Sequence, residues 1–88
     1  MKLKKDFLLR QVAGSWVVVA VGKASVDFNG MLTLNESGVL LWKTLESGAD
    51  RIALVNALTS EYEVTAEQAG ADVDEFMETL FRAGCLEE

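Results

Sequence analysis

The stretch that most constrains the fold is the run from Trp16 to Val21, which reads Trp-Val-Val-Val-Ala-Val. It is the longest apolar run in the chain, and it falls far short of the roughly 20 residues that a membrane-spanning helix needs. The run is rich in β-branched valine and too short for an ordinary helix, so it predicts a strand. We therefore expect Ser15–Val21 to form the central strand of a sheet.

Two further strands are predicted, one on each side of this run. Phe7–Val12 precedes it, and the Ala13-Gly14 pair between the two suits a tight hairpin turn. Asn29-Gly30 can adopt the positive φ angles of a turn before a short strand at Met31–Leu34. A strand of this length is typical of the edge of a sheet.

Three helices are predicted after the strands, and each has a start signal. Asn35, Asp50 and Thr65 are residue types that cap helix N-termini, and Thr65 begins a capping box with Gln68. Gly84 suits the end of the third helix. The chain has 88 residues, of which 50% are hydrophobic, enough for one core and one domain over residues 1–88. The predicted class is α+β and winged helix-turn-helix-like: a three-stranded antiparallel sheet followed by three helices.

The third helix carries two apolar sets on a helical wheel. One is a stripe that we expect to face the core, and it consists of Ala69, Val73, Phe76 and Leu80. The other lies to one side of the stripe, and it consists of Gly70, Met77 and Phe81. Acidic residues occupy the remaining faces of this helix.

Charge is divided unevenly along the chain. Residues 1–43 carry a net charge of +3 and residues 44–88 a net charge of −9, which together give the overall −6. A nucleic-acid-binding protein needs a basic surface to displace phosphate counterions, and the acidic C-terminal half would repel a phosphate backbone. We therefore expect no nucleic-acid partner. Because the predicted fold is winged helix-turn-helix-like, a winged-helix DNA-binding transcriptional regulator is the alternative function.

The residues of common catalytic and metal sites are missing. The sequence has no histidine and a single cysteine, Cys85, so neither an acid-base pair nor an internal disulfide is available. Cys85 is expected to be a small buried apolar residue. No glycine-rich phosphate loop occurs. We therefore expect no enzyme activity, no cofactor and no metal, and we place the chain in the cytoplasm, without a membrane partner.

The order and spacing of the helix signals resemble the PqqD family. The matching pieces are Leu34-Asn-Glu-Ser-Gly-Val-Leu-Leu-Trp42, Leu45, Gly48, Leu58, Glu61-Tyr62, Ala71-Asp-Val-Asp-Glu-Phe76, Leu80 and Ala83-Gly-Cys-Leu86. Proteins of this family are similar to the wider group of precursor-peptide recognition elements. The chain departs from the family in having Cys85 where leucine is common.

This resemblance implies a peptide chaperone or adaptor. Such a protein binds the leader segment of a ribosomally synthesised precursor peptide by β-strand addition, and a radical S-adenosylmethionine enzyme or another maturation enzyme modifies the rest. The resemblance places the peptide between the third strand and the third helix. The peptide-binding residues it implies are Gly30, Met31, Leu32, Thr33, Leu34, Gly70, Val73, Met77 and Phe81. Met77 and Phe81 are equally suited to the core, so both readings stay open, and we expect a monomer.

Overall fold

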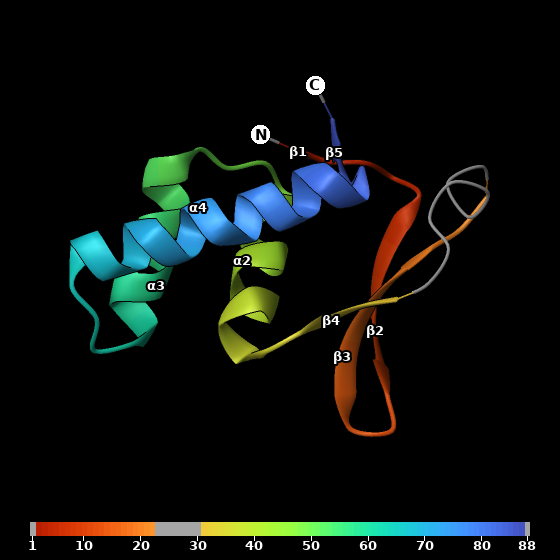
Figure 1. Ribbon diagram of the computed structural model, residues 1–88, viewed down its shortest axis with the longest axis horizontal. Coiled ribbons are helices and arrows are strands. Elements are labelled where there is room, and N and C mark those ends of the chain that lie inside the picture. The colour runs from red at the N-terminus through yellow and green to blue at the C-terminus, as the bar shows by residue number, and fades with distance from the viewer. Residues whose placement is uncertain (1, 23–30, 88) are drawn as a thin grey trace.

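The computed structural model describes residues 2–22 and 31–87 (Figure 1). In chain order its elements are β1 Lys2–Leu3, β2 Phe7–Val12, β3 Ser15–Ala20, β4 Met31–Leu34, α2 Glu36–Glu46, α3 Arg51–Glu61, α4 Ala66–Ala83 and β5 Leu86–Glu87. Strands β2, β3 and β4 form an antiparallel sheet in that order, and the three helices follow it. This is the α+β architecture expected from the sequence. The turn predicted at Asn29-Gly30 lies outside the described residues.

A tight turn joins β2 to β3. Ala13 and Gly14 have φ angles of 50° and 83°, the positive values that a two-residue type I′ hairpin turn requires. The turn sets the register, with Val12 opposite Ser15 and Phe7 opposite Ala20. The predicted hairpin is therefore confirmed, and β3 ends one residue earlier than expected.

One face of the sheet packs against the helices. Side chains alternate along a strand, so Val18 of β3 shares a face with Leu34 of β4 and with Phe7 of β2. All three are buried in the hydrophobic core, where Val18 has no exposed surface. Strand β3 pairs with β2 on one side and with β4 on the other, so its predicted central position is confirmed.

The three helices begin at the predicted capping residues. Each cap accepts a hydrogen bond from a backbone amide in the first turn, which satisfies a donor that the helix itself leaves unpaired. These bonds run from Gly38, Ala53 and Gln68 to the side chains of Asn35, Asp50 and Thr65, at 2.8, 2.8 and 3.1 Å. Gly84 has a φ of 76° and ends α4, as expected.

The core lies where α2, α3 and α4 meet one another and the sheet. Its largest fully buried side chain is Trp42 of α2, beside Leu45 of the same helix and Leu54 of α3. From α4 it takes Val73 and Leu80, both with no exposed surface. Within residues 2–22 and 31–87, no helix has the length and apolar composition needed to cross a membrane.

The two ends of the described chain pair with each other. Strand β1 lies antiparallel to β5, with Lys2 opposite Glu87 and Leu3 opposite Leu86. The amide of Lys4 also donates to the carbonyl of Cys85 at 2.8 Å. Figure 1 shows this small sheet beside the C-terminal end of α4. It holds the segment before β2 against the end of the last helix, and the sequence did not predict it.

Candidate functional site

The outer edge of β4 is the first part of the site. Val12 and Ser15 flank a two-residue turn, so they form a hydrogen-bonded pair, and such pairs alternate along the two strands. The amide of Val21 donates to the carbonyl of Asp6 at 2.8 Å, which agrees with this alternation. Odd-numbered residues of β3 therefore bond to β2, and even-numbered residues bond to β4.

This alternation decides which backbone groups of β4 are used within the sheet. Leu32 and Leu34 lie opposite even-numbered residues of β3 and pair with them. The amide and carbonyl groups of Met31 and Thr33 point away from β3. Strand β4 is last in the sheet order, and no described strand pairs with its outer side. A free edge of this kind can take up a further strand.

A hollow of about 360 Å³ lies between β4 and α4, and we call it the β4 groove. Its lining residues are Leu32, Thr33, Leu34, Asn35, Ser37, Gly38, Leu41, Asp72, Glu75, Phe76 and Thr79. The floor is apolar, because Leu34 and Leu41 are buried and Phe76 is half-buried. Exposed Thr33, Asp72, Glu75 and Thr79 form a polar rim. The groove thus pairs a free strand edge with apolar contacts and polar groups.

The structure places only part of the predicted site in this groove. Leu32, Thr33 and Leu34 line it, Met31 contributes its outward-facing backbone, and Gly30 lies outside the described residues. The α4 side of the groove comes from residues 72, 75, 76 and 79, which share one face of the helix. The resemblance described above implies the opposite flank, which carries Gly70, Met77 and Phe81.

That opposite flank has other neighbours. A Cβ atom on Gly70 would lie 2.8 Å from an Arg51 guanidinium nitrogen, so Gly70 faces the start of α3. Val73 is wholly buried, and Met77 is half-buried against the core. Phe81 is 69% exposed and lines a separate hollow beside the chain ends. The apolar residues of this flank suggest a groove, yet α3 and the core occupy most of the flank.

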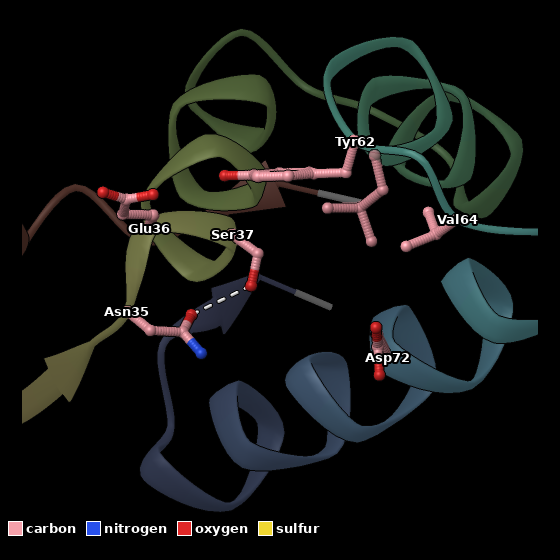
Figure 2. Close-up of a pocket in the computed structure, with 7 residues that line it drawn as sticks. Asn35, Glu36, Ser37, Tyr62, Val64 and Asp72 are labelled. Carbon is pink, nitrogen blue, oxygen red and sulfur yellow. Dashed lines mark hydrogen bonds between the residues drawn. The ribbon is translucent and has the colours of Figure 1, made fainter.

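A second hollow adjoins the β4 groove, and we call it the Tyr62 pocket. It has a volume of about 400 Å³ and is lined by Asn35, Glu36, Ser37, Leu58, Tyr62, Val64 and Asp72. Asn35, Ser37 and Asp72 line both hollows, so the two lie next to each other. Figure 2 shows Tyr62 and Asp72 on opposite sides of the pocket, and the bond from the Ser37 hydroxyl to the Asn35 side chain at 3.0 Å.

The charged side chains that line the two hollows are acidic. Glu36, Asp72 and Glu75 line them, and no lysine or arginine does so in the part of the chain that the structure describes. On the other flank of α4, Asp74 is paired with Arg51 at 2.8 Å. The hydrogen bond from Arg51 and the positive charge of Arg51 hold the pKa of the Asp74 carboxyl below its ordinary value. The carboxylates of the hollows have no such partner among the described residues.

Within the described residues, no group of three potential ligands is arranged to hold a metal ion. Cys85 is wholly buried, and this burial raises the pKa of its thiol to about 11. At neutral pH the thiol is therefore protonated and enclosed, which makes it a poor nucleophile. The arrangement is suited to holding an extended chain by backbone pairing and side-chain contacts.

Comparison with known proteins shows the family and the fold of this chain. Residues 15–86 match the sequence model of the family described as coenzyme PQQ synthesis protein D (PqqD). No curated protein matches the chain in sequence. Among solved structures, the fold is similar to that of TbiB1 in complex with the TbiA(beta) leader peptide, with a TM-score of 0.79. The two sequences are 22% identical, and the match covers 99% of this chain and 95% of that one.

Proposed function

Because this chain belongs to the PqqD family, we propose that it is a non-catalytic adaptor for a ribosomally synthesised precursor peptide. The leader segment of the precursor adds to β4 as a further strand, and its side chains enter the β4 groove. The adaptor then presents the remaining segment to a separate maturation enzyme, for which a radical S-adenosylmethionine enzyme is our candidate. The chain acts as a monomer in the cytoplasm.

The observation that carries this proposal is the free edge of β4 beside a groove with an apolar floor and a polar rim. Met31 and Thr33 together offer two amides and two carbonyls to a guest strand. Half-buried Leu32 and Phe76 offer apolar surface to guest side chains in the same place, and buried Leu34 and Leu41 complete the apolar lining. Backbone pairing provides affinity, and the groove provides selectivity for alternate side chains.

The solved structure of similar fold contains a peptide of the class proposed here. TbiB1 was captured with a leader peptide, and its chain matches almost the whole length of this one. A shared fold alone does not transfer a ligand, because function depends on the site. The support therefore rests on family membership together with the edge and groove of this chain.

The interaction free energies of the edge and the groove indicate how tightly a leader would bind. Four backbone hydrogen bonds contribute about 1 kcal/mol each, and two leucine-sized guest side chains about 2 kcal/mol each. Part of this is offset by the cost of ordering a flexible leader. The sum before this cost, about 8 kcal/mol, corresponds to roughly micromolar affinity, so the net affinity should be weaker than about 1 μM. An adaptor that must release its precursor after modification is well served by binding of that strength.

The alternative of a DNA-binding regulator gains no support from the surface of α4. The exposed residues of this helix include Glu67, Asp72, Glu75 and Glu78. A helix with these carboxylates would bring negative charge against the phosphates on either side of a major groove. Arg82, its one basic residue, is already paired with Glu78 at 2.7 Å.

Calorimetric titration tests the proposal directly. The probe is a synthetic leader segment of a precursor peptide encoded beside the gene for this chain, and its scrambled sequence is the control. We expect saturable binding of one leader per chain, with no binding of the scrambled peptide. Equal binding of both peptides, or of neither, would contradict the proposed function.

A further inference from the structure

We propose that the Tyr62 pocket is a subsite for a lysine or arginine side chain of the peptide bound along β4. The inference rests on the proposed function and deepens it, because it assigns a chemical class to one residue of the guest. A peptide paired with β4 runs alongside Thr33 and Leu34, and Asn35 follows directly in the chain. Asn35 lines both hollows, so a guest that extends past the strand reaches the Tyr62 pocket.

The walls of the pocket suit the aliphatic part of a long basic side chain. Leu58 is 2% exposed and forms an apolar surface with half-buried Val64. Lysine and arginine place their methylene groups against apolar surface while the charged end stays near water. Tyr62 adds an aromatic face, which attracts a cation placed over it.

Asp72 gives the pocket its charge preference. The nearby carboxylates of Asp74 and Glu78 each have an arginine partner, at 2.8 and 2.7 Å. Asp72 is exposed, lines both hollows and has no ionic or hydrogen-bond partner among the described residues. It lies beyond the first turn of α4, so the positive helix end does not account for an acidic residue there. A cation from the guest would supply the missing partner.

Glu36 strengthens the same preference from another element. It lies in the first turn of α2 and lines the Tyr62 pocket from the side of β4. Its position also suits the positive end of α2, so Asp72 remains the main argument. In Figure 2 Glu36 and Asp72 belong to different helices and lie on opposite sides of the view, and the hydroxyl end of Tyr62 points to the side of Glu36. An acidic guest residue at this position would be repelled by both.

Selection of displayed peptides tests the inference without a known leader. The probe is a multivalent phage library of random 12-residue peptides, because multivalency retains weak binders. Selection is run on the parent chain, on Asp72→Lys and on Glu67→Lys. The last is the matched control, because Glu67 is an exposed carboxylate of α4 that lines neither hollow. Thr33→Pro, which removes an outward amide of β4, identifies the clones that depend on the strand edge.

We expect edge-dependent peptides to be enriched in lysine or arginine at one position on the parent chain and on Glu67→Lys. On Asp72→Lys the enrichment should move to aspartate or glutamate. A selected lysine peptide should lose about threefold to tenfold in affinity on Asp72→Asn, measured by fluorescence polarisation. Edge-dependent peptides without basic enrichment would overturn this inference and leave the proposed function standing. If no peptide depends on the edge of β4, both are overturned.

Discussion

Thr33 of β4 lies directly opposite Val17 of β3. Val17 is one of the odd-numbered β3 residues, whose backbone groups bond to β2. The amide and carbonyl of Thr33 therefore face away from the sheet, and Thr33 also lines the β4 groove. A single residue thus combines an unpaired strand edge with the wall of the β4 groove, and this combination is what a guest strand needs.

Thr33→Pro should separate binding from folding. Proline is tolerated in an edge strand where the lost amide faces solvent, so we expect the free energy of unfolding to change by less than about 1 kcal/mol. The leader should lose about tenfold or more in affinity, because one hydrogen bond disappears and the ring obstructs the edge. Calorimetry measures the affinity, and urea unfolding measures the stability.

Thr33→Val is the matched control, because it keeps the amide, and its affinity should stay within about threefold of the parent. A folded Thr33→Pro chain with parental affinity would contradict strand addition.

Phe76→Ala and Phe81→Ala should distinguish the two flanks of α4. Phe76 is half-buried in the β4 groove, so its loss should weaken leader binding about tenfold and lower the free energy of unfolding by about 1 to 2 kcal/mol. Phe81 is 69% exposed beside the chain ends, so its loss should change stability by less than about 0.5 kcal/mol and leave affinity unchanged. Stronger loss of binding in Phe81→Ala than in Phe76→Ala would return the groove to the flank predicted from the sequence.

Much of the fold could be predicted because its signals are local. The β-branched run around Val18, the Ala13-Gly14 turn and the three capping residues each decide their own segment by short-range chemistry. The pairing of β1 with β5 could not be predicted in this way. Two-residue strands show no periodicity, and their pairing depends on where α4 ends relative to β2.

The strand side of the candidate site could also be predicted, and the helix side could not. Shortness marked Met31–Leu34 as an edge. A helical wheel shows which residues of α4 are apolar, but not which neighbour covers each flank. Gly70 signals the close approach of another element, and here that element is α3 through Arg51. On the wheel Asp72 and Glu75 fall on the remaining acidic faces, and in the structure they form part of the rim of the β4 groove.

Gly70→Ala tests how α4 is placed against α3. The new Cβ atom would displace the Arg51 guanidinium, which bonds to Asp74 at 2.8 and 3.1 Å. This ion pair is exposed, so solvent screens it and its loss should matter little, whereas alanine improves helix propensity by about 1 kcal/mol over glycine. Since a flexible side chain can move aside, we expect the free energy of unfolding to change by less than about 1 kcal/mol, with leader affinity unaltered. A loss above about 2 kcal/mol in urea unfolding would show that backbone atoms are in the way. Arg51→Ala combined with Gly70→Ala provides the control.

Cys85 should make the fold sensitive to alkaline pH. Burial raises the pKa of the folded-state thiol to about 11 from the ordinary 9.0, and nearby Lys4 acts in the opposite direction. The folded state therefore holds this proton more tightly than the unfolded state. Its contribution to stability is complete below about pH 9 and declines as the pH rises toward 11.

Urea unfolding at pH 7 and at pH 10.5 measures this contribution. Cys85→Ala is the control, because it lacks the thiol and should show a smaller decline between the two pH values. Ellman's reagent should react slowly with the folded chain and quickly in urea. An equal pH-dependent decline in both proteins, or rapid labelling of the folded thiol, would contradict the buried position of Cys85.

Amide hydrogen exchange along β4 tests the central claim most directly. Without leader, the amides of Leu32 and Leu34 should exchange slowly and that of Thr33 quickly, because only the first two are bonded within the sheet. At saturating leader, the Thr33 amide should become protected while those of Leu32 and Leu34 change little. A leader that binds while the Thr33 amide continues to exchange at its free rate would contradict strand addition at β4.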